Sequence, residues 1–295
     1  MSTSNGLSFR IEQTKARLAS IWDGQGRVLV LTGAGISAES GIPTFRGEEG
    51  YWRIGSRNYF PEELATRSAF QSMPDEVWGW YLYRRSVCRA ASPNSAHDAI
   101  ARLERELVSR GEAHRFVLVT QNVDGLHLRA GNTLERTYQI HGNIDFMRSM
   151  NDRDVHCFPL PIELGEVWEK GRAIGERERK LLHCPDGSPA RPHVLWFDES
   201  YDEPLFRYQS TLRAVEAASL VIVVGTSGAT TLPMSVVERA VQRQVPLLVT
   251  NRDPSVFSNM AVQSTKGHFI QGSAAEILPG VVDVILARAN GDIHA

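Results

Sequence analysis

The chain has 295 residues, of which 42% are hydrophobic and 22% are charged, and its formal net charge is −2. This composition is typical of a globular protein that is long enough for one large core and a smaller second lobe. The near-neutral charge gives no general attraction to nucleic acid or membrane, and no apolar run approaches the roughly 18 residues that span a bilayer. Because residues 1–6 are polar and unlike a secretion signal, we expect a cytoplasmic protein.

Four apolar runs predict buried strands, and each run ends in a glycine-rich or polar turn. They are residues 27–31, 116–119, 220–224 and 246–249. Helical spacing in residues 96–109 and 235–244 supplies crossovers between them. Continuous runs of Val, Leu and Ile are typical of parallel strands covered on both faces. We therefore expect an α/β fold with a doubly wound, Rossmann-like parallel sheet, in which the turns after the strands converge on one crevice.

Two stretches break the alternation of strands and helices. Residues 45–91 are aromatic-rich and mostly helical in pattern, whereas residues 143–192 are irregular, with Pro, His and charged residues. We interpret both as insertions that form a smaller lobe. Residues 15–44, 92–142 and 193–290 would then form the nucleotide-binding domain.

Residues 33–38 read GAGISA and directly follow the first predicted strand. They match G-x-G-x-x-A, in which glycines let backbone N–H groups approach a pyrophosphate at a helix start. A tight strand-to-helix turn without a ligand is the alternative. A dehydrogenase would also show a second strand ending in Asp or Glu about 20 residues later, but residues 41–47, GIPTFRG, are a loop. An ordinary dehydrogenase domain is therefore not indicated.

The longer run GAGISAESGIPTFRG, at residues 33–47, resembles the signature of the sirtuins. TQNVDGLH at 120–127, HG at 141–142, RPHVLWF at 191–197, GTS at 225–227 and Asn251 follow in the order of that family. The resemblance covers residues 21–279 and is closest to the class III branch. It implies removal of acyl groups from protein lysines in a reaction that consumes NAD and gives nicotinamide and O-acyl-ADP-ribose.

The resemblance also implies a set of site residues. Asn122 and His141 are the expected catalytic residues, because an imidazole titrates near neutral pH and can take a proton from a ribose hydroxyl. The expected NAD contacts are Gly33, Ala34, Gly35, Thr44, Phe45, Arg46, Gln121, Asn122, Asp124, Gly225, Thr226, Ser227, Asn251 and Ala274.

Each of these residues also has a purely structural interpretation. His141 could be a structural histidine before a glycine turn, and Asn122 and Asp124 could cap a helix. Thr226 and Ser227 could cap the following helix while also meeting phosphate or ribose. His127, which lies in the same motif as Asn122, is interpreted as a packed or surface histidine.

Tyr81 and Arg84 carry the information on the acyl group. Three residues apart, they share one helix face, where a phenol and a guanidinium can bind a carboxylate together. The pair resembles the acyl-pocket motif of sirtuins that remove succinyl, malonyl or glutaryl groups, and Thr44, where many sirtuins carry Asp, resembles the same branch. A solvated helix face is the alternative. The acyl-lysine segment is expected to bind as an added strand, and the implied substrate contacts include His193, Val194 and Phe197.

The chain departs from the family pattern in its cysteines. Sirtuins usually carry two Cys-x-x-Cys pairs that bind a structural zinc, but Ser149 and Asp152 stand where the first pair is expected. The remaining thiols and adjacent imidazoles are those of His156, Cys157, His183 and Cys184. Two thiolates and two imidazoles can bind zinc, yet adjacent residues make poor chelate spacing. We therefore predict no metal.

Two further departures concern loops. Asp198 stands where the family commonly has Gly, next to the segment that pairs with substrate. Residues 225–233, GTSGATTLP, are one residue longer than usual, which leaves the contacts of Gly228 and Ala229 open.

Three functions fit the sequence. The first is deacylation, for which we expect acylated proteins as partners, no nucleic acid or membrane partner, and a monomer. The second is NAD hydrolysis or ADP-ribosyl transfer at the same site, neither of which requires the carboxylate clamp of Tyr81 and Arg84. The third is a non-catalytic NAD or ADP-ribose sensor, which the set Asn122, Asp124 and His141 argues against.

Overall fold

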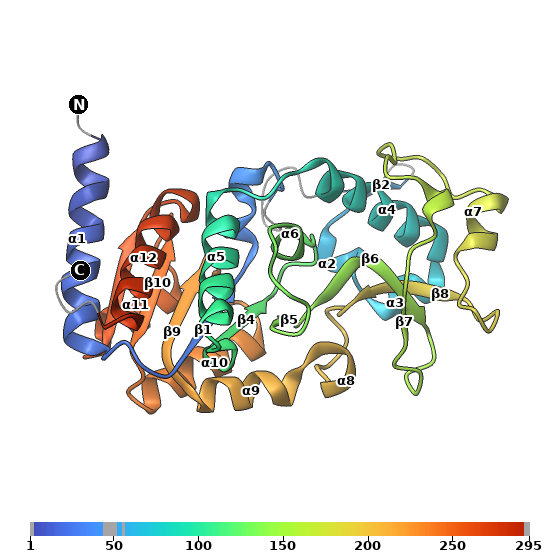
Figure 1. Ribbon diagram of the computed structural model, residues 1–295. Helices are drawn as coiled ribbons and strands as arrows, with labels where there is room; N and C mark the ends of the chain where they lie inside the picture. The colour runs from blue at the N-terminus through green and yellow to red at the C-terminus, as the bar shows by residue number, and fades with distance from the viewer. Residues whose placement is uncertain (1–2, 44–51, 55–56, 292–295) are drawn as a thin grey trace.

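The protein has two lobes, and the larger one is built on a six-stranded sheet (Figure 1). The computed structural model describes residues 3–43, 52–54 and 57–291. The sheet order is β11-β10-β9-β1-β4-β5, and all neighbouring strands are parallel. Its strands are β1 (Arg27–Thr32), β4 (Phe116–Thr120), β5 (Thr137–Gln139), β9 (Ala218–Val224), β10 (Leu247–Asn251) and β11 (Gly267–Gln271). The doubly wound sheet is thus confirmed, and β5 and β11 add an edge strand on each side of the four predicted strands.

Helices cover both faces of this sheet, as unbroken apolar strands require. One face carries α1 (Thr3–Ile21), α5 (Ser95–Ser109) and α12 (Ala274–Ala289), and the other carries α9 (Tyr208–Glu216), α10 (Thr231–Gln242) and α11 (Val256–Gln263). In β1, Val28 and Val30 belong to the first core, whereas Leu29 and Leu31 belong to the second. Successive strand residues point to opposite faces, so one apolar run supplies both cores.

The smaller lobe has its own core, a three-stranded sheet and a two-stranded sheet. Its helices are α2 (Pro61–Leu64), α3 (Arg67–Ser72), α4 (Pro74–Ala90) and α7 (Glu176–Leu181), its strands β2 (Trp52–Ile54), β3 (Arg57–Tyr59), β6 (Gly142–Ser149), β7 (Cys157–Pro159) and β8 (Ala190–Val194). The two-stranded sheet consists of β2 and β3, and the order β7-β6-β8 is antiparallel. Segment 143–192 is therefore more regular than its sequence indicates. Arg148 occupies a buried position of β6, where a strand pattern predicts an apolar residue. Its charge is compensated there by Glu199 at 3.7 Å, a contact that the sequence does not show.

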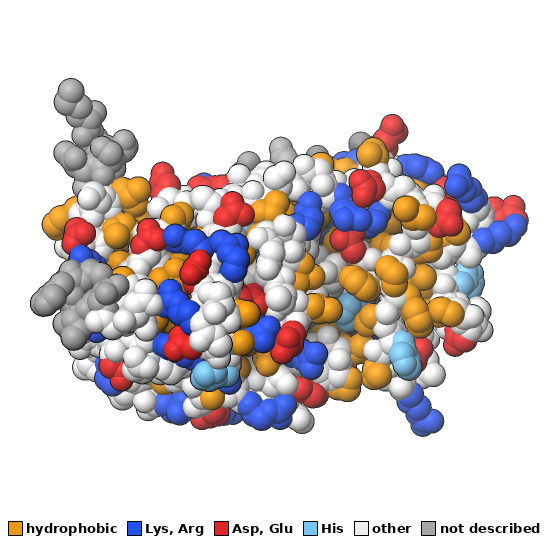
Figure 2. Space-filling model, in the orientation of Figure 1, with side chains coloured by type: hydrophobic (Ala, Val, Ile, Leu, Met, Phe, Trp, Pro, Cys, Tyr) orange, Lys and Arg blue, Asp and Glu red, His pale blue; other side chains and the backbone are white. Residues whose placement is uncertain are grey.

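The surface carries no single-sign patch on the face shown in Figure 2. Charges of both signs are interspersed over the larger lobe, and hydrophobic side chains gather over the smaller one. Within the ranges described, no helix combines the length and the apolar character needed to cross a membrane.

Candidate nucleotide and acyl-lysine site

The carboxyl ends of four parallel strands bring the predicted nucleotide residues to one edge of the sheet. Thr32 of β1 pairs with Thr120 of β4 and with Val224 of β9, and Val224 pairs in turn with Thr250 of β10. The turns after these strands therefore lie side by side, as the fold class predicts. Three of these turns begin at Gly33, Gln121 and Gly225, and Asn251 is the last residue of β10. Thr44, Phe45 and Arg46 lie outside the described residues.

The glycines of the first turn join it to the turn after β9. Gly33 N donates to Val224 O at 3.0 Å, and Gly35 N donates to Gly225 O at 2.8 Å. A Cβ on Gly35 would lie 2.7 Å from Gly225 Cα, and Gly225 itself has a φ of 62°. These glycines allow two backbones to approach closely, and the N–H groups of Gly33 and Gly35 are used within the protein.

The chain after this turn differs from the helix start that the motif indicated. It forms two three-residue 3-10 turns, Ala34–Ile36 and Ala38–Ser40. The second ends at Gly41, whose φ of 83° is left-handed and stops helical continuation. A long helix dipole is therefore absent from this described turn, and any phosphate contact here would depend on individual groups.

Two amide side chains hold the loop that follows β9. Gln121 Nε2 donates to Thr226 Oγ1 at 2.9 Å, and Asn251 Nδ2 donates to Thr226 O at 2.9 Å. Helix α10 has its N-cap at Thr230, so Thr226 and the exposed Ser227 do not cap it. The capping alternative for those two residues is therefore wrong.

The remaining nucleotide-side residues pack against α11 and α12. Gly228 has a φ of 81°, and a Cβ there would lie 2.3 Å from Val256 Cγ1. This part of the loop therefore lies in close contact with α11. Ala274 is buried and begins α12, where Glu39 accepts a hydrogen bond from Ala275 N at 3.0 Å.

A buried polar cluster joins the first turn to the end of β4. Ser37 Oγ donates to Asp124 Oδ2 at 2.7 Å and accepts from Asn122 Nδ2 at 3.0 Å. Burial raises the pKa of Asp124, while hydrogen bonds from Leu126 N and Ser37 oppose the rise. Asp124 also satisfies the first amide of helix α6 (Leu126–Arg129), whose N-cap is Gly125, since its Oδ1 accepts from Leu126 N at 2.9 Å. The capping and site interpretations of Asp124 are therefore compatible.

His141 is held in one tautomer beside this cluster. Its Nδ1 lies 3.0 Å from the carbonyl oxygen of Gln121, which can only accept, so Nδ1 carries the proton. Nε2 then keeps its lone pair, and it lies 2.7 Å from the hydroxyl of Tyr201. Burial lowers the pKa of His141 to about 4, and the bond to Gln121 opposes that shift. The neutral imidazole is thus the form present at neutral pH, as a general base requires.

His127 has the packed position expected for it. It is 2% exposed, its Nε2 lies 3.0 Å from Thr32 Oγ1, and its ring centroid lies 4.9 Å from that of His97. Burial lowers the pKa of both imidazoles, to about 4 for His97.

The predicted acyl clamp lies on α4, and its two residues have different surroundings. Tyr81 is 3% exposed and accepts a hydrogen bond from Trp196 Nε1 at 3.0 Å, which leaves the phenol proton as a donor. Burial raises the pKa of Tyr81. Arg84 is half-buried, with its guanidinium carbon 5.3 Å from the centroid of the Trp80 ring. Tyr81 is therefore a buried residue, unlike a residue on a solvated helix face.

The segment predicted to pair with substrate begins as an edge strand. Val194 ends β8, which has a neighbour, β6, on one side in its sheet. His193 is buried with its ring stacked 5.7 Å from that of Phe206. Phe197 is 57% exposed, and its N–H donates to Ala65 O at 2.9 Å. An edge strand leading to an exposed aromatic is a suitable platform for an added strand.

The zinc that the family pattern implies does not fit the residues present. Ser149 is buried, with its hydroxyl 3.4 Å from that of Ser188, and Cys184 N donates to Ser188 O at 2.8 Å. The carboxylate of Asp152 forms an ion pair with Arg67. Throughout the ranges that the structure covers, no group of three or more His, Cys, Asp and Glu side chains could hold a metal ion.

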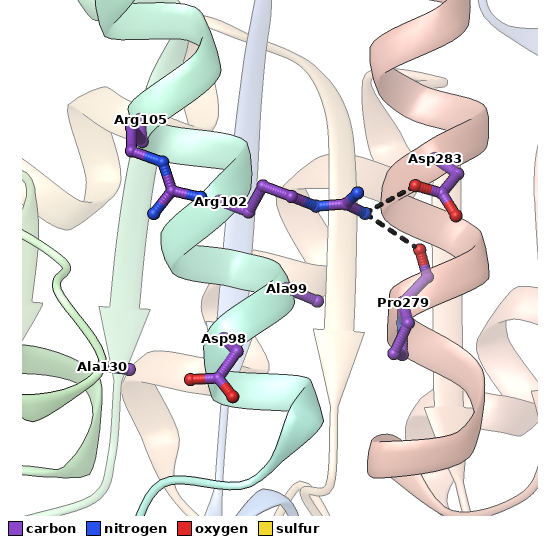
Figure 3. A pocket seen from close by; sticks show the side chains of 7 residues that line it. All are labelled: Asp98, Ala99, Arg102, Arg105, Ala130, Pro279 and Asp283. Carbon is purple, nitrogen blue, oxygen red and sulfur yellow. Dashed lines mark hydrogen bonds and ion pairs between the residues drawn. The ribbon is translucent and has the colours of Figure 1, made fainter.

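A separate surface pocket of about 410 Å³ lies between α5 and α12 (Figure 3). Arg102 crosses it, donating to Asp283 Oδ1 at 2.6 Å and to Pro279 O at 3.3 Å. Its lining contains none of the predicted site residues. We assign it no part in the site at the strand ends.

Two residues of the site were missed from the sequence. Ser37 lies inside the GAGISA motif, two residues after its second glycine. That position is the signal from which a polar role of its hydroxyl could have been predicted. Tyr201 is 60 residues from His141 in the chain and lies in no motif, so the sequence carries no signal for their contact.

The comparisons agree with this geometry. The model of the Sir2 family matches residues 33–231. A protein of Leptospira interrogans named NAD-dependent protein deacylase is 38% identical over 262 residues, covering 88% of this chain and 93% of its own. The zebrafish (Danio rerio) protein named NAD-dependent protein deacylase sirtuin-5, mitochondrial, is 34% identical over 270 residues, covering 87% of this chain and 82% of its own.

Solved structures give the same result. The crystal structure of a Sir2 homologue in complex with NAD has a TM-score of 0.72 and 32% identity, covering 93% of this chain and 94% of its own. A mutant Sir2 homologue in complex with 2′-O-acetyl ADP ribose has a TM-score of 0.71 and 31% identity, covering 96% of this chain and 98% of its own. By matched family model, sequence identity and fold, this chain belongs to the Sir2 family.

Proposed function

We propose that the protein is an NAD-dependent deacylase of protein lysines with a preference for acidic acyl groups such as succinyl and malonyl. The observation that carries this proposal is the neutral His141, whose Nε2 lone pair lies beside the convergent strand ends. We further expect a cytoplasmic monomer whose partners are acylated proteins, with the acyl-lysine segment lying along β8.

The chain's own groups fit an NAD-dependent reaction. NAD would supply the ribosyl carbon that bonds to the acyl oxygen as nicotinamide leaves. Asn122 offers an amide that can donate and accept, Asp124 offers a carboxylate, and both are bonded to the hydroxyl of Ser37. Such prepositioned groups can orient a carboxamide or a water without reorganising during the reaction. His141 Nε2 would take the proton of a ribose hydroxyl.

The preference for acidic acyl groups rests on Tyr81 and Arg84. Trp196 fixes the phenol oxygen of Tyr81, and the raised pKa keeps its proton in place as a donor. Arg84 adds a permanent positive charge on the same helix. A phenol and a guanidinium together suit a carboxylate.

The first experiment compares matched acetyl-lysine and succinyl-lysine peptides with NAD by mass spectrometry. Wild type should remove succinyl faster and His141→Ala should remove neither group. NAD consumption without peptide turnover would instead indicate hydrolysis or ADP-ribosyl transfer. Binding of NAD without any turnover would indicate a sensor. Either of these two outcomes would overturn the deacylase proposal.

Arg84→Gln tests the acyl preference separately. A hydrogen bond to a charged group contributes about 1.5–3 kcal/mol, so kcat/KM for succinyl-lysine should fall roughly 10- to 150-fold. The value for acetyl-lysine should change little. Arg105→Gln, in the pocket between α5 and α12, is the matched control. Equal losses on both peptides would contradict a role in acyl selection. Tyr81→Phe is less informative, because it would leave buried Trp196 Nε1 without its acceptor.

A further inference from the structure

The reactive nitrogen of His141 already has a partner within the protein. The hydroxyl of Tyr201 lies 2.7 Å from Nε2, while Nδ1 donates to the carbonyl of Gln121. Because Nε2 carries no proton in this tautomer, the phenol must be the donor. The lone pair that a general base needs is thus occupied by a neighbouring side chain.

Tyr201 is built into this position by its surroundings. Its ring packs against the core of α9, α10 and α11, and lies 6.3 Å from the ring of Tyr208 with an interplanar angle of 22°. Burial raises its pKa to about 12, although a hydrogen bond with Thr230 opposes the rise. The phenol therefore keeps its proton at neutral pH and remains a donor.

The orientation of His141 does not require Tyr201. Gln121 fixes the ring through its backbone carbonyl, and its side chain is fixed in turn by Thr230 and Thr226. The tautomer and the ring orientation of His141 are therefore already set by Gln121. The bond from Tyr201 has a different effect, which is that the lone pair of His141 Nε2 is engaged.

We propose that Tyr201 is a further functional residue of this site, which occupies His141 Nε2 in the free enzyme and yields that position to the ribose hydroxyl. A neutral imidazole has one acceptor lone pair, so it cannot accept well from the phenol and the ribose together. The proposal rests on the proposed function, because it takes His141 to be the base that meets NAD. Tyr201 is then a determinant of nucleotide affinity, acting before the chemical step.

Tyr201→Phe tests this competition, because it keeps the ring and removes the hydroxyl. One neutral hydrogen bond contributes about 0.5–1.5 kcal/mol, so the variant should bind NAD roughly 2- to 10-fold more tightly by calorimetry. KM for NAD should fall to match, with kcat unchanged. Tyr208→Phe removes a neighbouring hydroxyl from the same aromatic pair and should behave as wild type. A lower kcat in Tyr201→Phe with unchanged NAD affinity would overturn the proposal, since the phenol would then assist the chemistry.

A second readout uses the free protein and needs no activity. In the side-chain ¹⁵N spectrum, Nε2 of His141 should be an unprotonated acceptor whose resonance shifts in Tyr201→Phe and stays in place in Tyr208→Phe. An unchanged resonance in both variants would show that the phenol does not hold the base. If wild type shows no deacylation, the proposed function fails on its own evidence, and the spectrum and the calorimetry still decide the role of Tyr201.

Discussion

At the scale of single residues, the base of this site is defined by its surroundings. A solvated imidazole loses half of its neutral form at a pH of about 6.5, whereas burial lowers the pKa of His141 to about 4. A general base works in its neutral form. We therefore expect kcat/KM to stay level as pH falls from 8 through 6.5 and to decline only in the region of pH 5 and below.

The measurement is kcat/KM for one acyl peptide at subsaturating NAD across this range, with circular dichroism at each pH to confirm that the protein is folded. A half-loss of kcat/KM close to pH 6.5, without unfolding, would contradict the low pKa of His141.

The sequence predicts the position of a side chain best where that side chain follows a strand directly. Gln121 and Asn122 come after an apolar run, so the topology alone places them at the crevice. The sequence does not reveal that the N–H groups of Gly33 and Gly35 donate to the end of β9 and the turn after it. Nor could it place Tyr201 on His141, because that contact depends on how two distant loops pack.

At the scale of elements, Asp198 has a structural role that its position in the loop did not reveal. Its carboxylate accepts from Arg67 N at 2.8 Å and from Ser68 N at 3.2 Å, the first two amides of α3. Thr66 accepts from Ala69 N at 3.0 Å. A six-residue helix has few internal bonds, so satisfying its first-turn amides is a large part of its stability.

Asp198→Ala should therefore lower the free energy of unfolding by about 1 kcal/mol. Asp198→Asn, which keeps an acceptor oxygen without the charge, should recover part of the loss. Urea unfolding followed by tryptophan fluorescence measures both. The control is Asp253→Ala, an exposed position expected to change stability by less than about 0.5 kcal/mol. If Asp198→Ala were as stable as that control, the carboxylate would have no capping role.

Element prediction was accurate for the larger lobe and for the helices within residues 45–91, and it was poor for residues 143–192, for one physical reason. Parallel strands covered on both faces must be continuously apolar, and this is the pattern that β1, β4, β9 and β10 show. In the small sheet, Arg148 and Arg191 occupy buried strand positions because Glu199 neutralises them. Compensation of this kind exists only in three dimensions, so these strands appear irregular in the sequence. The domain boundaries at 45–91 and 143–192 remain predictions.

At the scale of the whole molecule, the two lobes have separate cores that are linked by side-chain hydrogen bonds. Asn94 Nδ2 donates to Ile36 O at 2.8 Å, and Arg129 Nη2 donates to Cys88 O at 2.6 Å. These bonds link the start of α5 to the first turn and the α6 region to α4. The bond from Arg129 therefore ties the segment that follows β4 to α4, the helix that carries Tyr81 and Arg84.

The smaller lobe must be stable without the structural zinc that the family pattern implies. Its core includes Met147, Leu160 and Trp168, all less than 9% exposed. The hydroxyl of Ser149, which stands where the family pattern has a cysteine, lies 3.4 Å from that of Ser188. Where a structural zinc is present, its binding free energy is part of the folding free energy.

We therefore expect a strong chelator such as EDTA to leave both the melting temperature and the NAD-dependent activity unchanged. Elemental analysis of the purified protein should find far less than one zinc per chain. Stoichiometric zinc together with a chelator-induced fall in the melting temperature would contradict this expectation. Cys184→Ser would then show whether the remaining thiols bind the metal, because loss of a thiolate ligand should release it. An unchanged melting temperature would mean that burial and hydrogen bonding stabilise this lobe without the metal.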